Sequence, residues 1–435
     1  MKKNITSQIL FEEQCIVDEA KVFYFEGRVL RAIYNEEQAI LFKKILNDGT
    51  LKTAFDTGLV KTKIADDICI NNCRLIIEHE KIEFFLHPVE MTDKMFYESA
   101  LTFINIAKDL SRFNLILKDA HPWNLTYHKG KPVFFDFSSI TESNKYYSHW
   151  VEEFYTYFAV PLKLAKSRWK LFSEEYRRQH LYGFGIRFFK LRRIKKYFFK
   201  DFHTVNAFLN KPSLFLQKLE DWVCKLSPAS SSGAWDEYDQ AHDTNYDRPL
   251  TSKQKFVSNV LKTHKPNKVI DFATNKGYYA FMAEHYQAKV IAFDYESFSI
   301  DEGLRYCLDK NITFCKMNFI LPTPSYGWSL TGPDAFKRFK SDVGLALGLI
   351  HHICLVQKFP VKLFCDTCSN YSKNGVLLEF VFPDDIHVKK WNAEIPSDYT
   401  LDDVKLYFGK YFKEVDISEL LTDGDIKRQL LFFHN

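Results

Sequence analysis

The sequence lacks several features that would narrow its function at once. Lys and Arg number 59 against 55 Asp and Glu, a net charge of +4, so the chain has no strong overall charge of the kind that favours nucleic-acid binding. No segment approaches the ~18 uninterrupted apolar residues of a transmembrane helix. Glu12 and Glu13 interrupt the N-terminal stretch, so we expect no signal peptide. These absences predict a cytoplasmic protein.

A regular cysteine framework is also missing. The nine cysteines are scattered and odd in number, which predicts a reducing compartment rather than a disulfide scaffold. The close pairs are Cys69 with Cys73 and Cys365 with Cys368. Structural zinc needs four ligands, so we expect plain buried thiols rather than a metal centre.

Glycine-rich phosphate loops are absent, yet one stretch has the pattern of a nucleotide-binding unit. Residues Lys268 to Glu296 comprise an apolar strand, the turn Ala273–Gly277, a helix-like segment and a second apolar strand ending in Asp294. The acidic residue follows the turn at about the 20-residue spacing of a ribose-binding carboxylate. An ordinary α/β unit that ends by chance in Asp is the alternative.

The first half of the chain has a different order of elements. A hairpin is predicted at 21–33, a helix at 36–46, a strand pair over RLIIEHEKIEFFL at 74–86, and a helix at 95–114. At 435 residues the chain is long enough for two or three domains. This order is that of a small kinase-like N-lobe followed by the start of a C-lobe.

The segment from Leu115 to Ile140 carries a pattern typical of phosphoryl transfer. Asp119 and Asn124 stand in D-x-x-x-x-N spacing, and Asp136 ends the apolar run PVFFDF. One carboxylate would orient the acceptor hydroxyl, and the amide with the second carboxylate would hold Mg²⁺. The loop resembles that of aminoglycoside-phosphotransferase-like kinases.

Two departures leave kinase activity open. Where such kinases carry an ATP-binding lysine, the strand VLRAI offers Arg31, which is not a simple substitute for Lys. Phe-Ser rather than Phe-Gly follows Asp136. The alternative is a retained fold whose site is structural.

Alternating strands and helices continue from Lys268 to the C-terminus and predict a parallel sheet with an antiparallel hairpin at its edge. VIDFATNKGYY and GLALGLIHHI resemble motifs of class I S-adenosylmethionine-dependent methyltransferases. The resemblance implies that the cofactor binds at Asp271, Ala273, Asn275, Gly277, Asp294 and Asn318, with Asp294 at the ribose and Asn318 at the adenine. Ala273 stands where the family usually has glycine.

Methyl transfer to a hydroxyl would need a general base. His351 and His352, which follow the fourth strand of this sheet, are the first candidates, and Glu379 and Asp384 at the end of the fifth are next. Packing and capping at a helix start is the alternative role of the histidine pair. The sequence does not choose between the two histidines.

Several motifs follow one another along the chain, namely LKDAHPWNLTYHKGKPVFFDFSSI, NFILPTPSYGW, GLIHHI, VLLEFVFPDD and PSDYTLDD. In this order they make nearly the whole chain similar to nodulation-type (NoeA-like) bacterial methyltransferases. The resemblance implies an α/β fold with an N-terminal α+β protein-kinase-like domain and a C-terminal seven-stranded Rossmann-like methyltransferase sheet. The expected boundaries are a kinase-like domain at 1–226 (lobes about 1–88 and 89–226), a linker and covering segment at 227–250, and a methyltransferase domain at 251–435.

Three functions remain open. The first is O-methylation of a glycan or small polar acceptor, with S-adenosylmethionine as cofactor. The second is a bifunctional kinase–methyltransferase that also uses ATP and Mg²⁺ and acts on a surface polysaccharide or its precursor. The third is a non-enzymatic binding module.

The basic, aromatic segment Arg187–Lys200 has three alternative roles, namely a solvated helix face, a contact with the inner membrane surface, or nucleic-acid binding.

Overall fold

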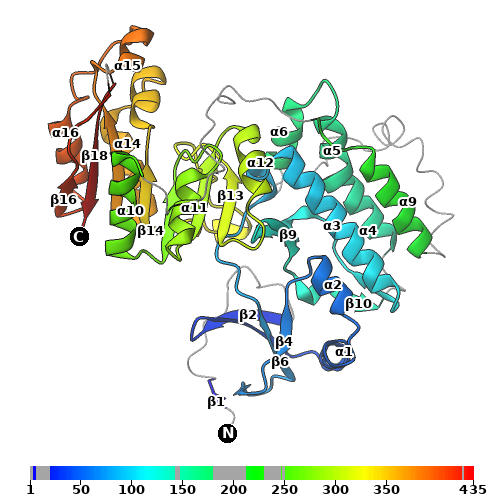
Figure 1. The fold of residues 1–435 in the computed structure, drawn as a ribbon. Coiled ribbons are helices and arrows are strands. Elements are labelled where there is room, and N and C mark those ends of the chain that lie inside the picture. The colour runs from blue at the N-terminus through cyan, green and yellow to red at the C-terminus, as the bar shows by residue number, and fades with distance from the viewer. Residues whose placement is uncertain are drawn as a thin grey trace. The chain divides into compact units, whose positions relative to one another are not determined.

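The computed structural model describes residues 3–5, 20–142, 147–179, 212–229, 246, 250–423 and 426–435. The segment Arg187–Lys200 lies outside these residues. The chain divides into two compact units, which Figure 1 shows as ribbons. Unit 1 comprises residues 1–127, 131–229 and 326–332, and unit 2 comprises residues 128–130, 230–325 and 333–435. Among the described residues, none of the helices has the length and apolar character needed to cross a membrane.

Unit 1 contains a small antiparallel sheet followed by a helical part. Its strands are β1 (Lys3–Asn4), β2 (Ala20–Phe25), β3 (Arg28–Ile33), β4 (Thr62–Ile64), β5 (Ile68–Cys69), β6 (Leu75–His79), β7 (Leu115–Leu117), β8 (Leu125–His128, whose last residue counts with unit 2), β9 (Lys131–Phe134) and β10 (Ile140–Glu142). Its helices are α1 (Glu36–Asn47), α2 (Lys52–Thr57), α3 (Asp93–Ser111), α4 (Tyr147–Phe154), α5 (Val160–Ala165), α6 (Leu171–Gln179) and α9 (Pro212–Cys224).

Four strands form the sheet in the order β2-β3-β6-β4, and all neighbours are antiparallel. The hairpin β2–β3 turns at Glu26 and Gly27, both with positive φ, as predicted from the sequence. The prediction of a second strand at 81–86 is wrong. Both edges of β6 are already paired, and the Leu86 N–H instead donates to the Thr126 hydroxyl at 2.8 Å. The apolar side chains of Ile82, Phe84 and Leu86 are buried in the core, but the backbone of this segment does not pair with the sheet.

Helix α3 forms the centre of the helical part. Thr92 caps its start by accepting from the Met95 N–H at 3.1 Å. Its apolar face is buried, and the Phe103 ring stacks on Trp150 and Phe158 with centroids 5.5 and 5.4 Å apart. Helix α9 lies beside α3 (Figure 1). The hairpin β8–β9 follows the predicted loop and leads to Asp136.

Unit 2 alternates strands and helices, as the sequence predicts. Its strands are β11 (Lys268–Asp271), β12 (Lys289–Asp294), β13 (Ile312–Lys316), β14 (Ser341–Ala346), β15 (Ser372–Val381), β16 (Glu414–Ile417), β17 (Leu421–Asp423) and β18 (Ile426–His434). Its helices are α10 (Ser252–His264), α11 (Tyr278–His285), α12 (Ser297–Arg305), α13 (Ala335–Arg338), α14 (Val361–Tyr371), α15 (Ile386–Trp391) and α16 (Leu401–Phe408).

The sheet of unit 2 runs in the order β13-β12-β11-β14-β15-β18-β16. The first five strands are parallel, and β18 lies antiparallel between β15 and β16. The strand order reverses between β11 and β14, which makes the carboxyl ends of these strands the expected ligand crevice. The prediction of seven strands is corrected to eight. Strand β18 extends beyond β16, and β17 pairs with the part that β16 leaves free.

Candidate functional site

The turn after β11 approaches the neighbouring strand closely. The Thr274 N–H donates to the Phe293 carbonyl at 2.8 Å, and the Gly277 N–H donates to the Thr274 carbonyl at 2.9 Å. Asn275 and Gly277 have φ of 50° and 100°. A Cβ on Gly277 would lie 2.7 Å from the Phe314 ring, so glycine is needed here for space as well as conformation.

Asp294 is bound directly to this turn. Its carboxylate accepts from the backbone N–H of Asn275 and of Glu296, both at 2.9 Å. The parallel pairing of β11 with β12 brings the ends of both strands to one edge of the sheet, which explains how two residues apart in the chain meet. The predicted turn and the predicted acidic residue therefore form one local structure.

This edge of the sheet concentrates buried acceptor oxygens. Burial raises the pKa of Asp271 to about 7 and that of Asp294 to about 6. Among the described residues neither carboxylate forms an ion pair, and Asn275 Oδ1 and Glu296 Oε2 are buried without a hydrogen-bond partner. Such a set favours a ligand that brings hydroxyl donors or positive charge.

Asn318 follows β13, the next strand outward. Its side chain is exposed, and its Oδ1 accepts from the Ile320 N–H at 3.1 Å. The Met317 N–H donates to the Asp294 carbonyl at 2.9 Å, which holds this loop beside Asp294. Ala273, half-buried, begins the turn on the other side. The six predicted cofactor residues thus lie along the carboxyl ends of three adjacent strands, β11, β12 and β13.

The two predicted histidines stand beyond β14, the neighbour of β11 on its other side. His351 is 3% exposed, and its ring is parallel to that of Trp391 at 5.4 Å. The rings of His351 and His352 are 4.2 Å apart. Burial lowers the pKa of His351 to about 3 and also lowers that of His352, so both imidazoles are neutral at pH 7. Nδ1 of His351 is buried without a hydrogen bond to the described residues.

Glu379 on β15 is held by two cations. Its carboxylate contacts Lys253 Nζ at 2.5 Å and an Arg428 nitrogen at 3.4 Å, and its side chain is 1% exposed. Burial alone would raise its pKa, but Lys253 and Arg428 outweigh burial and keep the pKa below its usual value. Arg428 also contacts the fully buried Asp385 at 3.3 Å. These pairings make Glu379 a stable anion and a weak proton acceptor.

No sequence pattern predicted these partners of Glu379. Lys253 comes from α10 and Arg428 from β18, far from β15 in the chain. The buried carboxylate of the loop after β15 is Asp385 rather than Asp384, which is exposed and pairs with Lys427. Only the folded topology brings these charges together.

A second cluster lies within unit 1, around the predicted Asp136. Arg31 contacts the Asp136 carboxylate at 3.3 Å and donates to the Ser138 hydroxyl at 2.6 Å. Ser138 in turn donates to the same Asp136 oxygen at 2.6 Å. Arg31, predicted as an ATP-binding cation, is therefore engaged by a residue predicted as a metal ligand. The side chain of Arg31 is only 6% exposed.

Asp119 belongs to the same cluster. Burial raises its pKa, and the nearby Glu153 and Asp136 carboxylates add to that rise. Glu153 accepts from the Ala120 N–H at 2.9 Å. The sequence analysis missed this residue, because it lies on α4 outside the D-x-x-x-x-N pattern. Asn124 is half-buried, and its carbonyl accepts from the Phe135 N–H at 2.9 Å.

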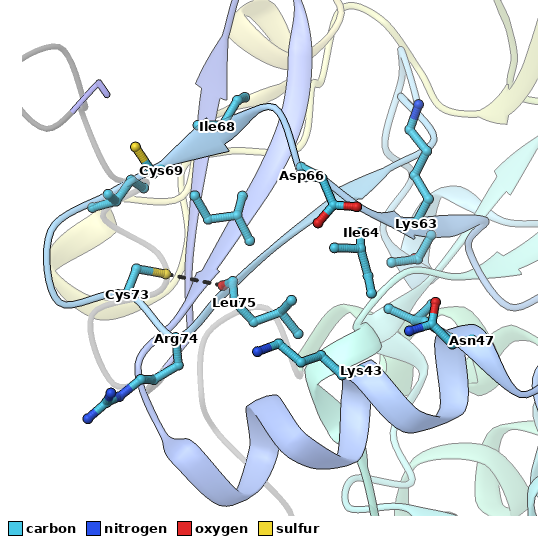
Figure 2. A pocket seen from close by; sticks show the side chains of 15 residues that line it. Lys43, Asn47, Lys63, Ile64, Asp66, Ile68, Cys69, Cys73, Arg74 and Leu75 are labelled. Carbon is cyan, nitrogen blue, oxygen red and sulfur yellow. Dashed lines mark hydrogen bonds between the residues drawn. The ribbon is translucent and has the colours of Figure 1, made fainter. Parts of the chain in front are cut away.

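Unit 1 also contains a cavity of about 590 Å³. Figure 2 shows this cavity between α1 and the strands β4 and β6, with Lys43 and Lys63 at its edge and Ile64 among its apolar lining. None of the predicted site residues lines this cavity.

The cysteine pair of unit 2 is buried. Burial raises the pKa of both thiols, Cys365 and Cys368, well above the usual range.

Comparisons with known proteins find a relative that matches most of the chain. No protein-family model matches the chain. The nodulation protein NoeA of Rhizobium meliloti (strain 1021) is 24% identical over 424 residues, which cover 87% of each chain.

Solved structures give weaker matches. The bifunctional kinase-methyltransferase WbdD is 14% identical with a TM-score of 0.32, covering 46% of this chain and 41% of its own. The N-methyltransferase NodS of Bradyrhizobium japonicum WM9, in complex with S-adenosyl-L-homocysteine, is 11% identical with a TM-score of 0.32, covering 46% of this chain and 95% of its own. The chain thus spans about two fifths of the WbdD structure that it matches. Over most of its length the chain is similar to the nodulation protein NoeA, as its motifs predicted.

Proposed function

We propose that the protein is an S-adenosylmethionine-dependent methyltransferase that acts on a hydroxyl group of a glycan or small polar acceptor. The observation that carries the proposal is the half-buried Asp294 carboxylate, which has a raised pKa, forms no ion pair among the described residues and is fixed to the turn after β11 by the Asn275 N–H. This carboxylate and the glycine-containing turn are the two parts that binding of an adenosyl ribose requires.

The residues at this edge fit the cofactor chemically. S-Adenosylmethionine brings two ribose hydroxyl donors, an ammonium group and a positively charged sulfonium. Asp294 would accept from the ribose, and Asp271 would face positive charge, which offsets the desolvation that raises the pKa of both carboxylates. Gly277 allows the backbone to approach the ligand. The antiparallel β18 inside the sheet favours this cofactor over a dinucleotide.

The acceptor would lie on the side of β14 and β15. When bound, the cofactor supplies an electrophilic methyl group for in-line displacement. The protein has to hold the acceptor oxygen in line and exclude water. Of the three residues predicted there, Glu379 is already held by Lys253 and Arg428, whereas His351 and His352 are neutral. Burial makes His351, with a pKa of about 3, a weak base, which suffices because the hydroxyl becomes strongly acidic as its oxygen gains the methyl group. We therefore assign proton transfer to the histidine pair and positioning to Glu379.

The test is calorimetry with S-adenosylmethionine. We expect Asp294→Ala to weaken binding by about 100-fold, because two hydrogen bonds to a charged acceptor are lost. Asp136→Ala, which removes a half-buried carboxylate from unit 1, is the matched control and should bind like the wild type. Equal affinity of Asp294→Ala and wild type would refute the proposal, and absence of binding by the wild type would favour a non-enzymatic module.

A second activity, phosphoryl transfer by unit 1, is supported by the proximity of Asp119 and Asp136. The Asp136 carboxylate lies near enough to help raise the pKa of Asp119, as expected of residues that share a Mg²⁺ ion and an acceptor hydroxyl. The Arg31 contact opposes this activity, because metal binding at Asp136 would have to displace or share that cation. The second candidate is therefore a bifunctional kinase–methyltransferase.

Thermal unfolding with ATP and Mg²⁺ tests this candidate. A rise in Tm that requires both ligands and disappears in Asp136→Ala would support it. Asp294→Ala serves here as the control and should retain the rise. A wild-type Tm that does not respond to ATP and Mg²⁺ would count against phosphoryl transfer and would leave the methyltransferase proposal untouched.

A further inference from the structure

Two histidines and an aspartate converge on one face of the unit 2 sheet. They are His264, Asp416 and His434, and one possible ligand atom of each lies within 4.8 Å of the others. None belongs to the candidate site at the carboxyl ends of the parallel strands. His434 pairs in register with Gly375, near the start of β15, whereas Glu379 stands further along that strand.

Three separate elements bring these side chains together. Strands β16 and β18 pair antiparallel, with Glu414 opposite His434 and Asp416 opposite Phe432. Residues two apart in a strand share a face, so the two acids lie on the same face as His434. Helix α10 packs against β18 and ends at His264 (Figure 1). The cluster is therefore fixed by the backbone of a helix and two strands.

Aromatic contacts orient the first histidine. The His264 ring packs on the Phe432 ring at 4.7 Å and on the His434 ring at 4.9 Å, at interplanar angles of 67° and 58°. The Phe432 and His434 rings stack at 4.9 Å. Two imidazoles side by side would repel one another if both carried a proton, whereas a metal ion uses both in the neutral form.

The distances agree with a shared cation. Nε2 of His434 lies 3.2 Å from Asp416 Oδ2, although the two atoms are not aligned as a hydrogen bond. A tetrahedral ion with bonds of about 2.0–2.2 Å holds neighbouring ligand atoms at roughly 3.3–3.5 Å. Nε2 is otherwise buried without a partner among the described residues. These two atoms thus already stand at about the spacing of adjacent ligands.

The other ring nitrogen of His434 faces a second carboxylate. Glu414 Oε2 lies 3.9 Å from His434 Nδ1. Metal-binding histidines usually donate their second N–H to a carboxylate or carbonyl group, which fixes the tautomer that binds the metal. Glu414 is in place for this role. Its position is a second observation, independent of the three ligand atoms.

We propose that His264, Asp416 and His434 bind a divalent transition-metal ion of the zinc class, with Glu414 orienting His434 and water completing the coordination. Nitrogen ligands favour such ions over Mg²⁺ and Ca²⁺, which prefer oxygen. His264 and Asp416 are exposed, so the ion enters from solvent. The ion joins α10 to β16 and β18. Two of these elements also carry Lys253 and Arg428, the partners of Glu379.

Calorimetry on the untagged, metal-free full chain tests the site with Zn²⁺ as the probe. We expect one equivalent of Zn²⁺ to bind and Mg²⁺ not to compete. Because His434 is largely buried, the variants are the exposed ligands, His264→Ala and Asp416→Asn, each expected to weaken binding by about 100-fold. Glu414→Gln should weaken it by about 10-fold.

His387→Ala removes an exposed histidine of α15 and is the matched control, with unchanged Zn²⁺ affinity expected. Co²⁺ in place of Zn²⁺ should give the visible absorption of a four-coordinate ion in the wild type and the control but not in His264→Ala. If His264→Ala and Asp416→Asn bind Zn²⁺ as the wild type does, or if the wild type binds none, the site is refuted. Neither outcome depends on binding of S-adenosylmethionine.

Discussion

The carboxylates of the two candidate sites differ in the partners that the fold provides. In unit 1, Asp136 follows an apolar strand and already has a cation and a hydroxyl donor, Arg31 and Ser138. In unit 2, Asp271 and Asp294 also end apolar strands, yet among the described residues they form no ion pair, and burial raises both pKa values. A cation therefore compensates the first site, whereas the carboxylates of the second have no cation partner in the described parts of the chain and would gain one from a bound ligand of positive charge.

We expect this difference to separate structural from ligand-binding carboxylates. Removing a partner from a compensated pair leaves a buried charge alone, which destabilises the fold. Removing an uncompensated carboxylate relieves a desolvation penalty, which stabilises the free protein but removes a ligand contact. Substitutions in the two units should therefore change stability in opposite directions.

The largest expected effect is that of Arg31→Ala. Loss of the guanidinium leaves Asp136 and Ser138 without their buried partner, so we expect the free energy of unfolding to fall by about 3–5 kcal/mol. Urea denaturation measures the change. The control is Arg74→Ala, whose pair with Glu36 is exposed and should contribute under about 1 kcal/mol. If both substitutions lower the free energy of unfolding equally, the pair of Arg31 with Asp136 stabilises unit 1 no more than an exposed pair does.

Asp271→Asn tests the carboxylates of unit 2, which have no cation partner among the described residues. The pKa of Asp271 is about 7 in the fold and about 3.9 in an unfolded chain, so between pH 4 and 7 the folded state holds the extra proton. Folding stability contributed by this group is therefore lost as pH rises through that window. We expect the variant to be more stable than the wild type by about 2–4 kcal/mol at pH 8 and similar at pH 4.

Urea denaturation at both pH values, without cofactor, measures this difference. Asp402→Asn, an exposed acid of α16, is the control and should change stability little at either pH. A destabilised Asp271→Asn at pH 8 would contradict the comparison, because it would show that the ionised carboxylate is compensated within the fold.

Local patterns predicted the parts of the fold that depend on neighbouring residues. The strand, turn, helix and strand from Lys268 to Glu296 follow from apolar runs and one turn, and the structure has them in that order. The prediction failed at 81–86, where alternating apolar residues fill the core without pairing. Alternation reports which side chains are buried and does not report whether a neighbouring strand has a free edge.

Charge partners could not be predicted in the same way. The pairing of Glu379 with Lys253 and Arg428, and that of Arg31 with Asp136, join residues from distant parts of the chain. No sequence period reports such contacts, because topology alone decides which strand ends meet. Acidic residues of both candidate sites were therefore predicted, while the presence or absence of their partners was not.

The smallest expected effect is the pH dependence of cofactor binding to the wild type. Ribose hydroxyls and positive charge favour the ionised forms of Asp294 and Asp271, so binding should lower both pKa values and release protons below about pH 7. For a group with a free-protein pKa of about 7, affinity should rise by about 10-fold between pH 6 and 8. Calorimetry in buffers of different ionisation enthalpy measures both the affinity and the protons released.

In Asp271→Asn the affinity should rise less steeply with pH, which would assign the titration to this carboxylate. An affinity that stays flat with pH in the wild type would mean that the ligand does not touch these carboxylates, and the contrast between the two sites would fail.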